Sequence, residues 1–375
     1  MIYNNFKDLK LSSLGFGSMR LPVNEDSTIN EEETLKMIDY AIKNGINYFD
    51  TAWGYHNGES EKVMGKLLKN YPRESFYLAT KFPGYDLSNM DKVEEIFEKQ
   101  LEKCQVDYFD FYLIHNVCEK NIDEYLNKEH GILDYLLKQK ENGRIKNFGF
   151  SVHGSLEVMN RFLEMYGPYM EFGQIQLNYL DYDFQDAKAK IEVLNKLNIP
   201  IWVMEPLRGG KLVNVSKEHE QIMKELRPDE TVVGFSFRFL QTFPEVTVTL
   251  SGMSSMEQLI QNIKIFEEHK PLNEEEKNTL FEIAKEMLSG NTVPCTACRY
   301  CTEYCPQGLN IPDLLALYNE YTFTGGGFLA PMKIASLPDD KKPSACLRCK
   351  ACEAVCPQQL KIAEAMADFT EKLSK

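Results

Sequence analysis

Two cysteine runs in the C-terminal part of the chain have a spacing suited to iron–sulfur chemistry. Each reads C-x₂-C-x₂-C-x₃-C-P, over residues 295–306 and 346–357. The first three thiolates of a run can converge on three irons of one cubane, and the fourth, next to proline, points away to a second cluster. We therefore predict two 4Fe–4S clusters. Their ligand sets would be Cys295, Cys298, Cys301 and Cys356 for one, and Cys346, Cys349, Cys352 and Cys305 for the other.

The alternative for these cysteines is zinc. Zinc sites usually need two C-x₂-C pairs rather than two quartets that each end in C-P, so the spacing favours clusters. The quartets resemble those of ferredoxins, and the long insert between them resembles ferredoxin domains of the helical kind. This resemblance implies a helical ferredoxin-like domain that passes electrons. Cys104 and Cys118 fit neither run and are expected to be ordinary buried thiols.

A second group of reactive side chains follows three apolar runs nearer the N-terminus. Asp50 and Tyr55 lie in F-D-T-A-W-G-Y, Lys81 in A-T-K-F and His115 in L-I-H-N. Reduction of a carbonyl needs hydride on carbon and a proton on oxygen. A tyrosine can give that proton if a lysine ammonium lowers its pKa, and an aspartate can keep the lysine charged. The histidine could orient the carbonyl or relay the proton.

These residues need a scaffold that brings strand ends together. Eight strand-like runs alternate with amphipathic stretches, which predicts parallel β/α units of an α/β fold that close into a (β/α)₈ TIM barrel. An open doubly wound sheet is the alternative, but no G-x-G-x-x-G turn follows the first run. The runs span 11–18, 46–51, 76–82, 108–115, 145–151, 172–178, 199–205 and 245–252.

The composition changes near residue 290, where the sequence GNTVP breaks a helical stretch and the cysteines begin. We predict a barrel over residues 1–290 and a ferredoxin-type domain over 291–375. Helices are expected within the second part at about 311–321 and 360–373, one after each cysteine run. The repeat of run and helix indicates an internal duplication.

Charge and hydropathy exclude several classes of partner. The formal net charge is −14, and all of it resides in residues 1–290, because 291–375 contain nine basic and nine acidic residues. Electrostatic binding to nucleic acid is not expected. No apolar run is long enough to span a bilayer, and the N-terminus does not read as a signal peptide. A cytoplasmic protein with no membrane partner is expected, and its clustered cysteines suit a reducing compartment.

The motifs of the first part together resemble the aldo-keto reductase family over roughly residues 8–270. The resemblance rests on F-D-T-A-x-x-Y-x-x-x-E, A-T-K and L-I-H, with G-F-G-S-M-R-L-P before them and Q-I-Q-L-N-Y-L after them. It implies that Asp50, Tyr55, Lys81 and His115 are the catalytic residues. It also implies a small-molecule carbonyl or alcohol substrate and an NAD(P)H cofactor.

The resemblance further implies where cofactor and substrate bind. The cofactor positions are Ser151, Gln176, Pro206, Leu207, Arg208, Gly209, Gly210, Ser251, Gly252, Met253, Gln258, Gln261 and Asn262. The substrate positions are Met19, Arg20, Trp53, Phe82 and Asn116. Two departures concern the dinucleotide. Met204 and Glu205 stand where many members have an aromatic residue, and Gly252 and Gln258 offer no cation for a 2′-phosphate, so little preference between NAD and NADP is expected.

The resulting interpretation is an aldo-keto reductase-type oxidoreductase whose two clusters exchange electrons with a ferredoxin-like partner. A flavin is a possible further cofactor, since it would connect hydride chemistry with one-electron transfer. The alternative is an electron-transfer iron–sulfur protein whose barrel no longer uses a nicotinamide. In a further alternative, the clusters are structural or sense redox state.

Overall fold

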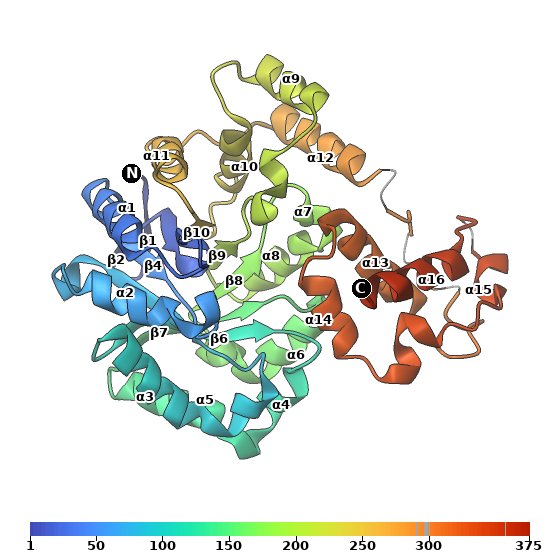
Figure 1. The fold of residues 1–375 in the computed structure, drawn as a ribbon, viewed down its shortest axis with the longest axis horizontal. Coiled ribbons are helices and arrows are strands. Elements are labelled where there is room, and N and C mark those ends of the chain that lie inside the picture. The colour runs from blue at the N-terminus through green and yellow to red at the C-terminus, as the bar shows by residue number, and fades with distance from the viewer. Residues whose placement is uncertain (290–291, 296–298, 300, 357) are drawn as a thin grey trace. The chain divides into compact units, whose positions relative to one another are not determined.

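The computed structural model describes residues 1–289, 292–295, 299, 301–356 and 358–375. Contacts divide the chain into two compact units, Met1–Phe281 and Glu282–Lys375, coloured blue to orange and orange to red (Figure 1). Each unit is described here by itself.

The first unit is a closed barrel of eight parallel strands, joined in the order β10-β3-β4-β5-β6-β7-β8-β9. This confirms the predicted (β/α)₈ barrel, and the open-sheet alternative is wrong. The barrel strands are β3 Leu14–Gly17, β4 Tyr48–Asp50, β5 Tyr77–Phe82, β6 Phe109–Val117, β7 Ile145–Val152, β8 Phe172–Gln176, β9 Ile201–Met204 and β10 Val246–Gly252.

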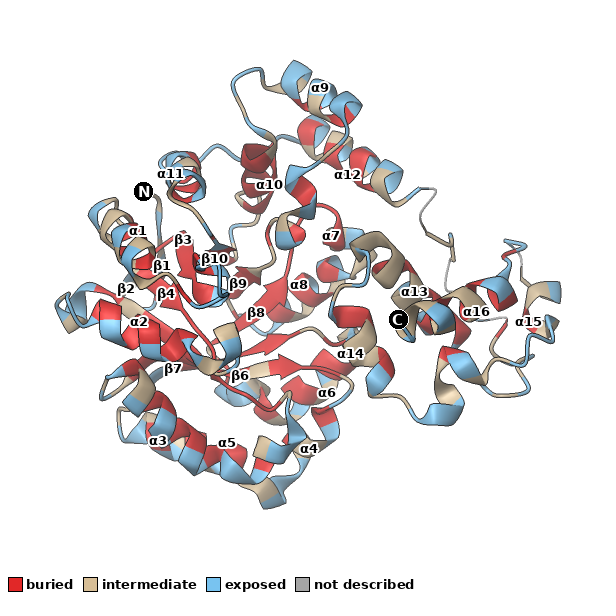
Figure 2. Ribbon diagram, in the orientation of Figure 1, coloured by how far each residue is buried: buried red, intermediate tan, exposed pale blue. Residues whose placement is uncertain are grey.

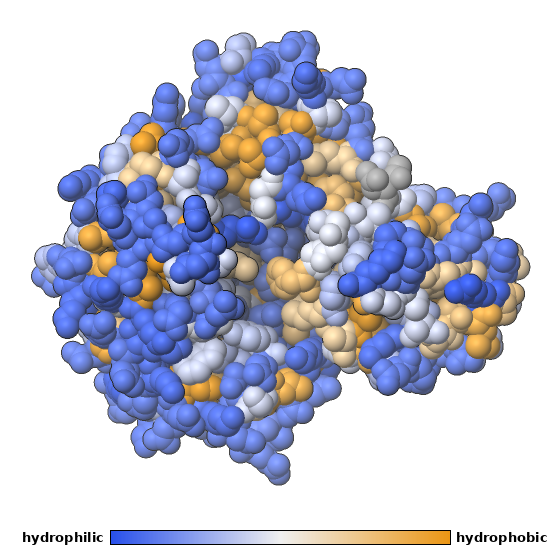
Figure 3. Space-filling view, in the orientation of Figure 1, coloured by the Kyte–Doolittle hydropathy of each residue, from blue (hydrophilic) through white to orange (hydrophobic). Residues whose placement is uncertain are grey.

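Helices surround the barrel, most of them with one buried face, while the strands are buried over most of their length (Figure 2). The outward faces of the helices are mainly hydrophilic, as Figure 3 shows over α2 and α3. The helices are α1 Glu31–Lys43, α2 Ser60–Leu68, α3 Val93–Cys104, α4 Ile122–Leu126, α5 Ile132–Glu141, α6 Leu156–Tyr166, α7 Asp181–Phe184, α8 Ala187–Lys196, α9 Lys217–Leu226, α10 Val232–Leu240, α11 Met256–Ile265 and α12 Glu274–Leu288.

A β-hairpin precedes the barrel and was not predicted from the sequence. Its strands, β1 Tyr3–Phe6 and β2 Leu9–Ser12, are antiparallel and pair Phe6 with Leu9. The Phe6 ring lies 5.1 Å from the ring of Trp202 and 5.7 Å from that of Phe111, both near the start of a barrel strand. The hairpin therefore contributes to the aromatic core at the amino ends of the strands.

The opposite end of the barrel carries the polar side chains. The register pairs Asp50 with Gly17 on one side and with Ala79 on the other, and it pairs Lys81 with Leu113. Asp50 and Lys81 thus lie near the carboxyl ends of adjacent strands, on the barrel face where catalytic groups of this fold collect. Tyr55 follows in a short 3₁₀ segment, Tyr55–Gly58.

The second unit is helical around one apolar core. Its helices are α13 Ile311–Thr324, α14 Leu329–Ala335, α15 Ala351–Ala354 and α16 Ile362–Leu373, of which α13 and α16 match the predicted ranges. The core contains Leu314, Leu315, Met366 and Phe369, which are almost fully buried. Of the described cysteines, Cys301 and Cys352 belong to this core, and Cys295, Cys305, Cys346 and Cys356 pack against it.

Contact between α2 and α3 leads to a prediction about stability. A Cβ on Gly65 of α2 would lie 2.5 Å from the backbone of Cys104, whereas one on Gly167 would be no closer than 3.6 Å to its neighbours. We expect Gly65→Ala to lower the free energy of unfolding by about 1–3 kcal/mol, because rigid backbone must shift. Gly167→Ala is the control, with little loss expected. Urea unfolding compares them, and equal stability of the two variants would contradict the contact.

Candidate active site and cluster sites

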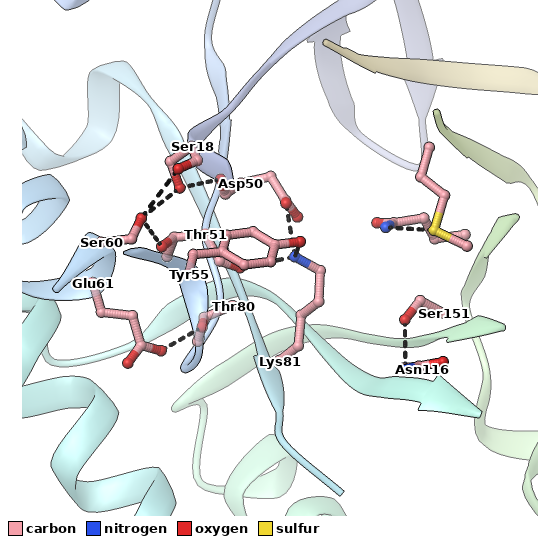
Figure 4. Close-up of polar contacts among 12 residues, drawn as sticks. Ser18, Asp50, Thr51, Tyr55, Ser60, Glu61, Thr80, Lys81, Asn116 and Ser151 are labelled. Carbon is pink, nitrogen blue, oxygen red and sulfur yellow. Dashed lines mark hydrogen bonds and ion pairs between the residues drawn. The ribbon is translucent and has the colours of Figure 1, made fainter. Parts of the chain in front are cut away.

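An ion pair between Asp50 and Lys81 occupies the interior of the barrel near its carboxyl end (Figure 4). Lys81 Nζ donates to Asp50 Oδ1 at 2.7 Å and to the carbonyl oxygen of Thr51 at 2.8 Å. Burial alone would lower the pKa of Lys81, but the charge of Asp50, with the hydrogen bonds to Asp50 and Tyr55, outweighs it and raises that pKa. The lysine is therefore held as an ammonium without access to water.

Tyr55 lies over this ammonium. Its hydroxyl is 3.5 Å from Lys81 Nζ, and the ring centroid is 5.0 Å from the same nitrogen. The sequence argument expected a lowered tyrosine pKa. Lys81 does act in that direction, but burial has the larger effect, so the pKa of Tyr55 is raised above its ordinary value of 10.0. In this structure Tyr55 is a protonated hydroxyl.

His115 lies beside Tyr55, with ring centroids 6.2 Å apart. Burial, followed by the nearby charge of Lys81 and by His153, lowers the pKa of His115 well below its ordinary value, so the ring is neutral. Its Nδ1 is buried and has no hydrogen-bond partner among the described residues, and the same holds for Asp50 Oδ2. Buried polar atoms without hydrogen-bond partners are costly in a protein, so these two atoms mark a place where stability is lost beside Tyr55.

Behind Lys81 is a buried polar network that the sequence argument missed. Glu61 is fully buried on α2 and accepts hydrogen bonds from Thr80 Oγ1 and Gln100 Nε2, both at 2.7 Å. Gln100 Nε2 also donates to the carbonyl oxygen of Lys81 at 3.0 Å. The network ties the end of β5 to helices α2 and α3. Its signal in the sequence was a glutamate on the apolar face of a helix, beside Met64.

Hydroxyl groups fix the segment that follows β4 (Figure 4). Ser18 Oγ donates to the carbonyl oxygen of Asp50 at 2.8 Å, and Ser60 Oγ donates to Ser18 Oγ at 2.9 Å. Ser60 Oγ and Thr51 Oγ1 are also 2.9 Å apart. These contacts connect three consecutive segments of the barrel around the base of the Asp50 side chain.

The predicted substrate residues differ in their surroundings. Met19 and Arg20 are exposed in a 3₁₀ segment after β3, and the Trp53 ring is covered by Lys103 Nζ at 3.8 Å. Phe82 is fully buried and packs edge-on against Tyr125, so it contributes to the core. Asn116 is buried and donates its backbone N–H to Ser151 Oγ at 2.8 Å.

Tyr85 is an aromatic residue of the site that the sequence argument did not name. Its ring meets the His115 ring edge-on at 5.2 Å. Its hydroxyl lies so close to Gly54 that a Cβ there would be 2.3 Å away. Burial raises the pKa of Tyr85 to about 12. Tyr85 therefore connects the loop after β5 to the segment that carries Trp53 and Tyr55.

The predicted dinucleotide residues include one pair with defined hydrogen-bonding capacity. Ser151 Oγ accepts the Asn116 N–H, which leaves the hydroxyl hydrogen available to donate. Gln176 Nε2 donates to Asp181 Oδ2 at 2.8 Å, which leaves the amide oxygen available to accept. A carboxamide needs one acceptor and one donor opposite it, so these two side chains fit that group.

Arg208 has a structural role that the resemblance did not indicate. Its Nε lies 2.9 and 3.0 Å from the two carboxylate oxygens of Asp181, and both residues are buried. Asp181 also accepts from Asn178 Nδ2 at 2.6 Å. Arg208 thus anchors the loop after β9 to α7. The neighbouring predicted positions Pro206, Leu207, Gly209 and Gly210 lie in or next to that loop.

The remaining predicted positions follow β10. Asn262 Nδ2 donates to Ser251 Oγ at 3.1 Å, and Gln258 Oε1 accepts the Ser254 N–H at 2.8 Å. These side-chain groups connect α11 to the end of the strand. Gly252 is exposed, Met253 is buried and Gln261 is half-buried.

The second unit brings four cysteines of the second predicted ligand set around one cavity. They are Cys305, Cys346, Cys349 and Cys352. Leu309, Ile311, Ile362 and Met366 form apolar walls. Backbone N–H groups of Leu309 and Arg348 donate to the sulfurs of Cys305 and Cys346, both at 3.4 Å.

The chemistry of this cavity fits an iron–sulfur cluster. Burial raises the pKa of Cys352 to about 11, and neighbouring cysteine charges add to that rise. Burial thus disfavours a bare thiolate at Cys352, and an iron–sulfur cluster bound by the four cysteines would supply the positive centre that stabilises it. Of the first ligand set, Cys295, Cys301 and Cys356 pack on the same core, and Cys298 lies outside the described residues. Cys104 and Cys118 are buried, as predicted.

The sequence of each part of the chain matches a known protein family. A sequence model for the Aldo/keto reductase family matches residues 13–285, and one for a 4Fe-4S dicluster domain matches residues 294–360. The uncharacterized oxidoreductase YqkF of Bacillus subtilis is 25% identical over 310 residues, which cover 74% of this chain and 94% of that protein. L-galactose dehydrogenase of Arabidopsis thaliana is 25% identical over 298 residues, covering 73% and 90%.

Solved structures agree on the fold. The aldo-keto reductase AKR11C1 from Bacillus halodurans, in its holo form, has a TM-score of 0.61 at 22% identity, over 76% of this chain and 96% of that chain. An aldo-keto reductase from Klebsiella pneumoniae in complex with NADPH has a TM-score of 0.59 at 18% identity, over the same fractions. No helix in the described part of the chain is both long and apolar enough to cross a membrane.

The ligand sets lead to a prediction about Cys305. We expect Cys305→Ala to lower the iron content by up to about half and to damage the cluster of the second run, because its thiolate crosses over. The matched control is Cys104→Ala, which removes a buried thiol outside both runs and should keep the iron content of the native chain. Iron and sulfide analysis with electron paramagnetic resonance measures both. Selective loss of the first-run cluster would contradict the assignment.

Proposed function

Because the chain belongs to the aldo/keto reductase family, we propose that its barrel reduces the carbonyl group of a small molecule, or oxidises the corresponding alcohol. The observation that carries this proposal is the buried Asp50–Lys81 pair beneath a protonated tyrosine. A histidine whose lowered pKa favours the neutral ring lies next to the tyrosine. No other described group of residues combines a proton donor, a fixed ammonium and a neutral imidazole.

Each residue has a distinct part in the proposed reaction. Tyr55 gives its proton to the carbonyl oxygen, and Lys81 stabilises the phenolate that remains. Asp50 keeps Lys81 charged. His115 orients the carbonyl through a hydrogen bond, since a neutral imidazole can donate from one ring nitrogen. The overall change adds two electrons and two hydrogens to the carbonyl group.

A nicotinamide dinucleotide would supply hydride to the carbonyl carbon. Ser151 and Gln176 would hold its carboxamide, the first as donor and the second as acceptor. Hydrogen bonds of Asn262 and Gln258 stabilise the loop after β10, at which the proposed dinucleotide positions lie. This supports the proposal indirectly. A flavin is not part of the proposal, since no flavin motif occurs in the sequence.

The dicluster domain would exchange electrons one at a time with a ferredoxin-like protein. Two clusters can together hold the two electrons that one carbonyl reduction requires. The expected compartment is the cytoplasm, where clustered thiols stay reduced.

A second candidate is an iron–sulfur electron-transfer protein whose barrel does not use a nicotinamide. Met204 favours it, because an aromatic ring that could stack on a nicotinamide is absent at this position. Gln174 Nε2 lies 3.6 Å from the Met204 sulfur, so this side chain contacts the barrel interior. Titration with NADH and with NADPH separates the candidates, since only the first requires stoichiometric dinucleotide binding.

Replacing Tyr55 by phenylalanine tests the proposed reaction. Tyr55→Phe removes the proton donor and keeps the ring, so we expect carbonyl reduction to fall by about 10²- to 10⁴-fold. Dinucleotide affinity and unfolding should change little. Tyr135→Phe, which removes a hydroxyl from helix α5 on the outside of the barrel, is the matched control and should keep native turnover. Steady-state kinetics over a panel of small carbonyl compounds measures both, and native turnover in Tyr55→Phe would refute the role of Tyr55.

The pKa directions give an expected pH profile. Burial raises the pKa of Tyr55 above 10.0 and lowers that of His115 well below 6.5. Both groups then keep one protonation state from about pH 6 to pH 9, so kcat for reduction should stay nearly constant there. Alcohol oxidation needs the phenolate and should rise with pH. Loss of reduction rate from pH 6 to pH 8 would instead indicate a protonated histidine as the acid.

A further inference from the structure

One cysteine of the second run reaches the surface of its unit. Cys349 is exposed, whereas Cys352 of the same run is buried. Leu347 is 60% exposed, and Arg348 and Lys350, which flank Cys349 in the sequence, are exposed as well. We call Leu347, Arg348, Cys349 and Lys350 the 347–350 edge. A cluster held by this run would therefore have one ligand at the protein surface, with charged and apolar side chains around it.

The charges of this edge are uncompensated. Nearby Lys341, Lys342 and Lys361 each contact a carboxylate, those of Asp340, Asp339 and Glu364. Arg348 and Lys350 have no ionic partner among the described residues of the chain. Glu353, the acidic residue nearest to them in the sequence, accepts the Ala363 N–H at 2.8 Å. The edge therefore presents two positive charges that no neighbouring carboxylate neutralises.

The first cysteine run differs in charge. Arg299 lies 3.6 Å from the Asp313 carboxylate, and Glu303 and Tyr304 are exposed beside Cys305. The remainder of the chain is strongly acidic, because residues 1–290 carry the net charge of −14. An acidic partner would be repelled by most of the chain and attracted to the 347–350 edge.

The backbone of the 347–350 edge is left-handed at two residues. Arg348 and Lys350 have φ values of 55° and 60°, in the left-handed region that favours glycine and asparagine. The left-handed turn lets the Arg348 N–H reach the Cys346 sulfur at 3.4 Å. Glycine would satisfy this geometry with less strain, but it would supply no charge. Arg299 of the first run has the same backbone conformation, with a φ of 64°, so the left-handed turn belongs to the cysteine loop, and a docking role is supported by exposure and charge alone.

We propose that the 347–350 edge docks an acidic protein that carries one electron, with Leu347 as the apolar contact and Arg348 and Lys350 as its charged rim. This assignment rests on the proposed function in one respect, that the clusters lie on the electron path. Cys305, Cys346, Cys349 and Cys352 would hold the cluster that takes up one electron, and the reduced centre of the carrier would be the electron donor. No covalent bond changes and no proton moves.

Affinity tests the proposal without turnover. The probe is a plant-type [2Fe–2S] ferredoxin, a small acidic carrier, titrated calorimetrically against the chain with both proteins oxidised. We expect Arg348→Glu/Lys350→Glu to weaken binding by about tenfold or more. The matched control is Lys188→Glu/Lys196→Glu on α8, which makes the same charge change on exposed residues of the barrel. The control should bind within about twofold of the native chain.

A second variant separates docking from cluster assembly. Arg348→Asn/Lys350→Asn removes both charges with a residue that adopts left-handed backbone readily, and it should keep the iron content of the native chain. The double asparagine variant should also bind the ferredoxin more weakly. Its affinity should change less between roughly 20 and 200 mM NaCl than that of the native chain, because salt screens ion pairs and the variant has lost them. Loss of iron in both variants would assign the two cations to cluster assembly and overturn the docking role.

Other results would also decide whether the 347–350 edge is a docking surface. Native affinity in both variants would overturn the proposal, as would equal binding of a basic carrier such as cytochrome c. Reduced methyl viologen, a small cation, should reduce the clusters of all variants at similar rates, because it needs no docking surface. Failure of the proposed carbonyl chemistry would appear in the Tyr55→Phe comparison and would leave these binding results unchanged.

Discussion

A buried ion pair, Asp50 with Lys81, is the constraint around which the barrel is arranged. Two charges removed from water are tolerated only when each is paired and further hydrogen-bonded. The barrel meets this requirement with adjacent strands β4 and β5, whose register brings the two side chains to one end. Loss of either partner would leave an uncompensated charge, so the pair fixes the geometry of the site as well as its charge. Tyr55 and His115 take their protonation states from the same buried surroundings.

The polar network behind this pair has a different function. Glu61 and Gln100 contact neither Tyr55 nor His115 in any described hydrogen bond, yet Gln100 holds the backbone of Lys81. A lysine side chain has many rotamers, and its charge is useful only where its nitrogen is fixed. The network therefore fixes the backbone of Lys81 from the outside of the barrel, while Asp50 and the carbonyl oxygen of Thr51 hold its ammonium on the inside. The hydroxyls of Ser18 and Ser60 act in the same way on the chain after β4.

The barrel and its strands could be predicted from the sequence because each apolar run is bounded by amphipathic helices. The hairpin could not, since its turn at Lys7 lacks the Asn-Gly or Asp-Gly signal that marks two-residue turns. The direction of the Tyr55 pKa was also missed, because a lysine in the same motif does not reveal how deeply the tyrosine is buried. Arg208 was expected near the cofactor, and its pairing with Asp181 depends on a contact between residues 27 apart in the chain.

The hairpin also has a consequence for the order of folding during synthesis. Asn4 Nδ2 donates to the carbonyl oxygens of Val246 and Thr247, at 3.3 and 2.8 Å, across more than 240 residues of sequence. Chains are made from the N-terminus, and contacts of such separation cannot form until both ends have left the ribosome. The Asn4 side chain must therefore wait for these partners until β10 is complete, whereas Phe6 can already pack on Phe111 and Trp202 of earlier strands. The barrel closes only when its last strand emerges, and the cysteine runs follow it, so cluster assembly begins on a chain whose barrel already has all its strands.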